Sequence, residues 1–204
     1  MGVNRTSGSK NESACRELIV YACPTGELAA GLEHYFAATM YRCGSNTAHE
    51  YMPHCTLTGF FHDDFISITS YVRAMEMALA QARANKPEPA IAIAGMTLEP
   101  TFHYLAVRSP WLEMLTATFA KLADSSTRID ELRLKTNLHV SLAYGFEPQQ
   151  EKTLRDLASE LDWQVPVGWE VRFYERHSRP DGSSAVSRQE DLERRWTCHG
   201  CWEV

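Results

Sequence analysis

Residues 53–61 read PHCTLTGFF, and residues 138–146 read LHVSLAYGF. Each stretch holds a histidine followed two positions later by Thr or Ser, and both have Leu three positions and Phe seven positions after the histidine. With eight histidines in 204 residues, composition alone predicts about one such His-x-Thr/Ser triplet. The triplets by themselves are weak evidence, whereas their matched surroundings predict two strands with the same role.

Side chains alternate between the two faces of a β-strand, so residues two positions apart share a face. In the first stretch this alternation places His54 beside Thr56 and Thr58, and in the second it places His139 beside Ser141. The residues between them are apolar: Cys55, Leu57, Val140 and Leu142. Each strand is therefore expected to bury one face in the core and to present an imidazole and a hydroxyl on the other.

The order of predicted elements is similar around both stretches, with a strand and a helix before each and a helix and a strand after it. Short apolar runs predict the strands, and apolar residues at helical spacing predict the helices. The predicted strands cover residues 17–23, 54–61, 90–98, 102–107, 138–143, 169–176 and 196–204, and the predicted helices cover residues 28–43, 68–85, 109–123 and 148–161. A polar segment at 177–188 is expected to be mobile.

Two similar halves, with histidines 85 residues apart at positions 54 and 139, predict a pseudo-twofold arrangement in an α+β protein. No linker rich in Pro or Gly divides the middle of the chain, so residues 14–204 are expected to form a single domain. Residues 1–13 are polar and predict a disordered leader. The first residues also fit a myristoylation pattern with Gly2 as the acceptor, although one acyl chain anchors a protein only marginally.

The composition restricts the ligand and the compartment. The chain has a net charge of -6 and a pI of about 5.7, so its field does not favour long duplex nucleic acid, and a nucleic-acid ligand is expected to be short. No apolar stretch approaches the roughly 20 residues that span a bilayer, and the N-terminal residues do not form a secretory signal. A cytoplasmic location without stable membrane insertion is expected, and the six cysteines should not form structural disulfides there.

Two histidines that face one cleft suit in-line displacement at phosphorus. A neutral imidazole removes a proton from the attacking water or hydroxyl, and a protonated imidazole donates one to the departing oxygen. Hydroxyl groups beside them stabilise the charge that develops on the nonbridging phosphate oxygens. The candidate catalytic residues are therefore His54, Thr56, His139 and Ser141, with no cofactor and no metal. Such a pair predicts a bell-shaped pH profile with both limbs within about two units of neutrality.

The motifs resemble those of the 2H phosphoesterases, a family named for paired His-x-Thr/Ser motifs on a two-lobed α+β fold. The chain looks most like the phosphodiesterase domain of the TULA (ubiquitin-associated and SH3-containing) proteins, on the basis of residues 53–61, residues 138–144 and the segment WEVRFYER at 169–176. The resemblance implies a pseudo-twofold fold in which antiparallel sheets line a central cleft and helices lie outside. Ser141 stands where some relatives have Thr, a change that keeps the hydroxyl donor.

The resemblance also implies metal-independent hydrolysis of 2′,3′-cyclic phosphates, on a small nucleotide or the end of a short RNA. It assigns His139 to activate water and His54 to protonate the leaving 3′ oxygen, which gives a 2′-phosphate. Two alternatives stay open: cleavage of 2′,5′-linked oligoadenylate, and a non-catalytic module that binds a nucleotide or a protein. We recognise no ubiquitin-associated, SH3 or histidine-phosphatase region, so those roles are not carried over, and the sequence identifies no protein partner.

Residues outside the two motifs supply further candidates. Tyr144 is the preferred residue for stacking on a base, ahead of three other aromatic residues: Phe60, Tyr104 and Trp111. Three cations near predicted strand ends have the charge to neutralise a phosphate, although each is more commonly a solvated surface residue: Arg108, Arg133 and Lys135. A Cys-x-x-Cys spacing at residues 198–201 supplies two of the four ligands that a structural zinc site needs, so no metal site is predicted there.

Overall fold

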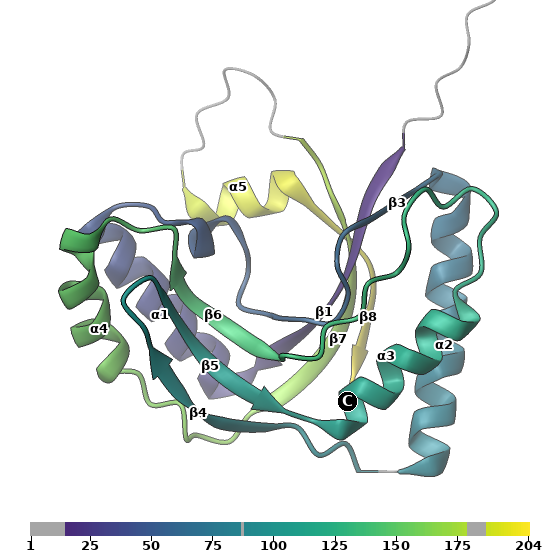
Figure 1. The fold of residues 1–204 in the computed structure, drawn as a ribbon, viewed down its shortest axis with the longest axis horizontal. Helices are drawn as coiled ribbons and strands as arrows, with labels where there is room; N and C mark the ends of the chain where they lie inside the picture. Colours follow the sequence, from purple (N-terminus) through teal and green to yellow (C-terminus); the bar gives the residue numbers. More distant parts are fainter. Residues whose placement is uncertain (1–14, 87, 179–186) are drawn as a thin grey trace, which may run out of the picture.

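The computed structural model describes residues 15–86, 88–178 and 187–204. The predicted leader at residues 1–13, which includes Gly2, lies outside the described residues, as do residues 179–186 of the segment predicted to be mobile. Within the described residues, one antiparallel sheet of eight strands is combined with five α-helices (Figure 1). The predicted α+β class is confirmed.

The strands follow the order β4-β5-β6-β2-β1-β7-β8, and β3 pairs with the beginning of β1 on the same edge as β2. Their bounds are β1 (Arg16–Thr25), β2 (Cys55–Thr56), β3 (Phe61–Asp63), β4 (Ala92–Leu98), β5 (Phe102–Arg108), β6 (His139–Tyr144), β7 (Gly168–Arg176) and β8 (Trp196–Glu203). The separate sheets that were expected on the two sides of a cleft are joined into one. The reason is that β2 and β6 pair at the centre, where Cys55 is opposite Val140.

Four of the α-helices form two pairs outside the sheet, and α5 lies apart from them against β8 and η1 (Figure 1). α1 packs beside α4 on the left of Figure 1, and α2 packs beside α3 on the right, where α2 also contacts β8. The helix bounds are α1 (Gly26–Cys43), α2 (Ile68–Asn85), α3 (Pro110–Leu122), α4 (Glu151–Ser159) and α5 (Arg188–Arg195), with short 3₁₀ helices η1 (Thr47–Glu50), η2 (Phe65–Ser67) and η3 (Pro148–Gln150). None of the helices in the described ranges is long and apolar enough to cross a bilayer.

The order of the elements agrees with the predicted pseudo-twofold relation. β1, α1 and β2 correspond to β5, α3 and β6, after which α2 and β4 correspond to α4 and β7. A twofold axis between β2 and β6 exchanges β1 with β5 and β7 with β4 in the sheet order. The two motif strands are therefore neighbours at the centre of the sheet.

β1 is buried on both faces and separates two apolar clusters. Side chains on one face join the main core beneath the helices: Leu18, Val20 and Ala22. Those on the other face join a smaller cluster with residues of β7, α5 and β8: Ile19, Tyr21, Cys23, Tyr174, Leu192 and Trp196. Because burial of a large apolar side chain stabilises a protein by about 1.5–3 kcal/mol, both clusters hold β1 in place. The smaller cluster includes Tyr21, and the His54 ring packs against this tyrosine.

The strand predicted for the first motif is wrong in its extent, because it divides into β2 and β3. The backbone N–H groups of Leu57 and Thr58 both donate to the Val20 carbonyl, so the ladder with β1 slips at this point. The next residue, Gly59, donates instead to the carbonyl of Arg133 over 2.7 Å. The chain thus changes its pairing partner within three residues, which alternation of apolar side chains does not reveal.

α5 was not predicted from the sequence. Leu192 is its one buried side chain, so no helical spacing of apolar residues marks it. Its N-cap is Ser187, whose Oγ accepts a hydrogen bond from the Glu190 N–H over 3.2 Å. The helix is held by arginine contacts rather than by a broad apolar face, because Arg188 donates to the carbonyls of His49 and Tyr51.

Candidate active site

A cleft of about 380 Å³ lies over the centre of the sheet and is lined by both sequence motifs. All four candidate catalytic residues line it: His54, Thr56, His139 and Ser141. They belong to two rows of alternate residues, one at positions 54, 56, 58 and 60 and the other at positions 133, 135, 137, 139 and 141. The pairing of β2 with β6 brings the two rows together, although they are far apart in the sequence.

The orientation of His54 is fixed by a hydrogen bond at the edge of its imidazole and by an aromatic ring against its face. Its Nδ1 lies 2.7 Å from the carbonyl oxygen of Met52, and because a carbonyl can only accept, Nδ1 is the protonated nitrogen. The imidazole also packs against the Tyr21 ring, tilted by 37° with 3.9 Å between centroids, and the Tyr51 ring is 5.4 Å away. Nε2 is therefore the ring nitrogen that remains for a ligand.

His139 is held in the same way as His54. Its Nδ1 donates to the carbonyl of Asn137 over 3.0 Å, which again leaves Nε2 for a ligand. Aromatic edges from β5 surround the ring, with Phe102 at 5.3 Å and Tyr104 at 5.5 Å between centroids. Both histidines thus use the carbonyl two residues earlier to fix the tautomer, which is the orientation that general acid–base chemistry needs.

Burial lowers the pKa of His54 to about 4, from an ordinary value of 6.5. The hydrogen bond to Met52 acts in the opposite direction, and the charge of a protonated His139 lowers the pKa of His54 further. At neutral pH, His54 of the free protein is therefore uncharged and Nε2 is a proton acceptor. To act as the proton donor that the family resemblance implies, it must take up a proton when an anionic ligand binds.

The two motif hydroxyls are available to a ligand. Thr56 and Ser141 are partly exposed in the cleft, and neither hydroxyl bonds to another described residue. Thr58, the next residue in the row, has a different role because its buried Oγ1 accepts a hydrogen bond from the Val20 N–H over 3.0 Å. Thr56 and Ser141 are consequently the two motif hydroxyls that can donate to a phosphate oxygen.

Tyr144 lines the cleft, as predicted, but an irregularity in β6 places it there. The register with β5 shifts between His103, which is opposite Ala143, and Tyr104, which is opposite Ser141. The shift leaves Leu142 as an extra residue, so two successive side chains are buried and Tyr144 returns to the cleft face. Strict alternation from Ser141 would have turned this tyrosine away from the cleft.

The other candidates separate into residues that line the cleft and residues that do not. Arg133, Lys135 and Phe60 line it. Arg108 is exposed at the end of β5 and Trp111 is buried in the main core, so neither contributes to the cleft. Tyr104 contacts the His139 ring from β5 without forming part of the lining.

Tyr51 and Tyr21 are lining residues that the sequence did not single out. The loop around Tyr51 is held from α5 and β8, because Arg188 donates to its carbonyl and the Trp196 indole donates to the Glu50 carbonyl over 3.3 Å. The Tyr51 hydroxyl also accepts a hydrogen bond from Arg176 over 3.3 Å. No local sequence signal identifies Tyr51, since each of these contacts comes from a residue more than 120 positions away.

No three His, Cys, Asp or Glu side chains converge into a metal-binding arrangement in the described ranges. All six cysteines are free thiols. In the Cys-x-x-Cys segment of β8, Cys198 donates to the Gly200 carbonyl and Cys201 donates to Glu170, each over 3.2 Å.

No family model matches the chain. The ubiquitin-associated and SH3 domain-containing protein B of Mus musculus is 30% identical over 171 residues, which cover 80% of this chain and 26% of that protein. This chain is a relative of the ubiquitin-associated and SH3 domain-containing proteins. The predicted resemblance to the ubiquitin-associated and SH3 domain-containing proteins is thereby confirmed.

Two further relatives have names that refer to a phosphatase. The ecdysteroid-phosphate phosphatase of Drosophila melanogaster is 27% identical over 206 residues, covering 84% of this chain and 27% of that protein. The ecdysteroid-phosphate phosphatase of Bombyx mori is 29% identical over 174 residues, covering 80% of this chain and 25% of that protein. The chain therefore spans about a quarter of the length of the curated relatives that it matches.

Proposed function

We propose that this chain is a metal-independent phosphodiesterase that hydrolyses 2′,3′-cyclic nucleotides, or the 2′,3′-cyclic phosphate ends of short RNAs, to 2′-phosphates. The observation that carries the proposal is the convergence of two histidines in one cleft, each with Nδ1 bonded to a backbone carbonyl and Nε2 left for a ligand. The phosphatase names of two relatives support phosphoester hydrolysis as the general reaction class.

In the proposed reaction, neutral His139 takes a proton from a water molecule whose oxygen attacks phosphorus. The bond between phosphorus and the 3′ oxygen breaks, and protonated His54 donates its proton to that oxygen. Thr56 and Ser141 donate hydrogen bonds to the nonbridging oxygens, where negative charge increases in the transition state. The product keeps the phosphate on the 2′ oxygen.

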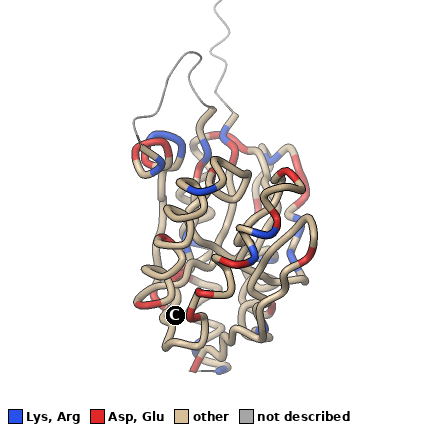
Figure 2. The backbone as a smooth tube through the Cα atoms, turned by 90° about the vertical axis from the view of Figure 1, so that its left-hand side faces the viewer, with Lys and Arg blue, Asp and Glu red and all other residues tan. Residues whose placement is uncertain are grey.

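The charge of the cleft supports an anionic ligand. Lys135 and Arg133 are among its lining residues, and none of the described lining residues is Asp or Glu, although the whole chain has a net charge of -6. On the face shown in Figure 2, Lys and Arg alternate with Asp and Glu along the described backbone. The positive charge therefore favours a small anion in the cleft over a long nucleic acid on the outer surface.

The product identifies the direction of cleavage. With adenosine 2′,3′-cyclic phosphate and EDTA, we expect release of adenosine 2′-phosphate, identified by phosphorus NMR against both monophosphate standards. A 3′-phosphate product would reverse the proposed orientation of the substrate. Loss of activity in EDTA would contradict the metal-independent mechanism, because a metal-bound hydroxide does not need the histidine pair.

The same assay distinguishes the alternatives. Cleavage of 2′,5′-linked oligoadenylate at a higher kcat/KM would make that linkage the substrate, and release of phosphate from a steroid phosphate would extend the named activity of the relatives to this chain. Binding of a nucleoside 2′-monophosphate without turnover of any ester would favour the non-catalytic module.

Removal of either motif hydroxyl should reduce catalysis to an intermediate degree. In Thr56→Val and Ser141→Ala, the loss of one hydrogen bond to a charged group should cost about 1.5–3 kcal/mol, or about ten- to a hundredfold in kcat. Steady-state kinetics of the purified variants measure the effect. Thr136→Val is a matched control, because Thr136 is exposed and does not line the cleft. An effect confined to KM would assign the hydroxyls to ground-state binding instead.

A further inference from the structure

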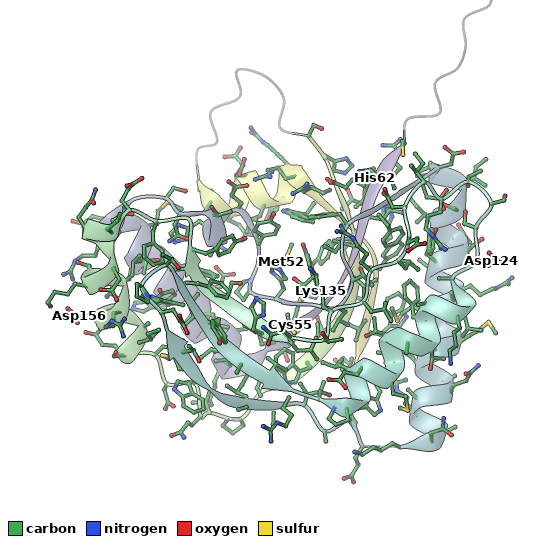
Figure 3. The ribbon with its side chains drawn as sticks, in the orientation of Figure 1. Met52, Cys55, His62, Asp124, Lys135 and Asp156 are labelled. Atoms are coloured by element: carbon green, nitrogen blue, oxygen red, sulfur yellow. The ribbon has the colours of Figure 1, made fainter. Side chains whose placement is uncertain are left out.

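Two cations extend the row of cleft-facing residues beyond His139. Arg133 and Lys135 lie six and four positions before His139 in that row and line the same cleft. In Figure 3, Lys135 lies at the centre of the molecule, between the two halves of the sheet. At no more than about 3.6 Å per residue, the Cα atoms of Lys135 and His139 are at most about 14 Å apart. The histidines and the two cations are therefore close enough to contact the same small ligand.

The segment that carries the two cations is fixed to the opposite row of the cleft. The Arg133 carbonyl accepts a hydrogen bond from the Gly59 N–H over 2.7 Å, and the Lys135 N–H donates to the Leu57 carbonyl over 3.0 Å. Between these bonds, Leu134 forms an isolated bridge with Thr58. This short ladder gives residues 133–135 a strand-like alternation, so the side chains of Arg133 and Lys135 lie on the same face, toward the cleft.

Gly59 makes room for the guanidinium of Arg133. The backbone of Gly59 does not have a positive φ, so its conformation does not require glycine. A Cβ added at this position would lie 3.2 Å from both Nε and Nη2 of Arg133, and the guanidinium atoms are the nearest that it would meet. The Arg133 side chain therefore packs against the Gly59 backbone, a position that any larger residue would disturb.

The two cations lack the ionic partners that several other arginines of the described chain have. Arg176 pairs with Glu17, Arg172 with Glu170 and Arg188 with Glu33, whereas neither Arg133 nor Lys135 forms a salt bridge with a described residue. The pKa of Asp130 is lowered mainly by its hydrogen bond with His62, and the charge of Arg133 contributes a smaller lowering. Two cations without an ion-pair partner in one concave site favour an anionic ligand.

The cations lie on one side of the histidine pair only. By the pseudo-twofold relation, the positions six and four before His54 are Ala48 and Glu50, which supply no positive charge. The pseudo-symmetric centre with Thr56 and Ser141 therefore suits one phosphate, and the cations beside it suit a second. The positive charge is therefore distributed unevenly along the cleft, and a substrate with one phosphate would leave the two cations without a partner.

We infer that the cleft is built for a 2′,3′-cyclic phosphate that carries a second phosphate on its 5′ side, either a 5′-phosphorylated nucleotide or the end of a short RNA. Arg133 and Lys135 bind the second phosphate, while the histidines and hydroxyls act on the cyclic one. This inference rests on the proposed function, because it takes the position of the reacting phosphate from it.

The test compares adenosine 2′,3′-cyclic phosphate with the same compound bearing a 5′-phosphate. In the unmodified protein, the 5′-phosphate should raise kcat/KM at least about tenfold, mainly through KM, and the preference should shrink as the salt concentration rises. In the double variant Arg133→Ala/Lys135→Ala, the ratio of the two kcat/KM values should fall below about two. Arg108→Ala is the matched control, because this exposed arginine lies outside the cleft and should leave the ratio unchanged.

Gly59→Ala provides an independent variant that keeps both cations. Its methyl group should displace the Arg133 guanidinium, so the preference for the 5′-phosphate should decrease without any change in charge. An equal kcat/KM for the two substrates in the unmodified protein, or a preference that survives in the double variant, would overturn the inference. If neither compound is hydrolysed, the proposed function fails instead. Calorimetry with adenosine 2′,5′-bisphosphate and adenosine 2′-monophosphate then tests the second phosphate site alone, because tighter binding of the bisphosphate that the double variant loses would support the site and equal binding of the two would overturn it.

Discussion

Replacement of His139 or His54 by alanine is expected to lower kcat for cyclic phosphate hydrolysis by about 10²- to 10⁴-fold. Each substitution removes one of the two groups that transfer protons, and the hydroxyls and cations that remain cannot replace it. Because His139 is partly exposed and, among the described residues, its side chain bonds to the Asn137 carbonyl alone, the fold should tolerate its loss. The measurement is kcat of each purified variant, with circular dichroism and thermal unfolding as the check on folding.

His34→Ala is a matched control for these two variants, because His34 is an exposed histidine on α1 outside the cleft. It should keep full activity. His54 packs on Tyr21, so His54→Gln is a second variant that fills much of the same space. A variant of either motif histidine with full activity, or a loss of activity that follows a loss of folded protein, would contradict the catalytic assignment.

The two histidine motifs and their relative placement could be predicted from the sequence. The same pattern of residues recurs in two strands, and it indicates which side chains of each strand share a face. Both histidines, both hydroxyls and Tyr144 line one cleft, as expected. The reason for the position of Tyr144 could not be predicted, since it depends on a register shift that leaves Leu142 as an extra residue. Pairing irregularities arise from contacts with a neighbouring strand and leave no regular pattern in the chain itself.

The parts of the cleft that were missed depend on contacts between distant segments. Residues 133–135 lie outside the predicted strands and helices, yet hydrogen bonds to residues 57–59 give them the alternation of a strand. Tyr51 is positioned by Arg176 and Arg188, both from elements near the end of the chain. Local periodicity reports which face of an element is apolar, but it does not report which loop will be held against a strand.

The pKa of His54 makes the assignment of roles testable. In the free protein burial lowers its pKa to about 4, which places the expected acidic limb below the range within two units of neutrality that the sequence predicts. The acidic limb of kcat/KM reports the lower of the two histidine pKa values in the free enzyme, whichever histidine is the base, and should therefore lie near pH 4. At pH 5 the profile should therefore still be near its plateau, whereas an acidic limb at the ordinary histidine pKa of 6.5 would leave only about 3% of the activity.

If His54 is the proton donor, the bound phosphate must raise its pKa. At pH 6 only about 1% of a group with a pKa of 4 is protonated, and protonation of half the molecules requires a rise of two units, or about 2.7 kcal/mol. Attraction between two unit charges about 4 Å apart near a protein surface is about 4 kcal/mol, which is sufficient. We therefore expect binding of adenosine 2′-phosphate at pH 6 to take up a proton on His54.

Proton uptake is measured by calorimetry in buffers that differ in ionisation enthalpy, and NMR titration of the His54 ring in the free and bound protein identifies the site. His54→Gln should abolish the part of the uptake that belongs to this residue, which separates it from protonation of the ligand phosphate. A His54 that keeps a pKa near 4 in the complex would be neutral throughout the working range. It would then be the base that activates water, and His139 would have to supply the proton to the leaving oxygen.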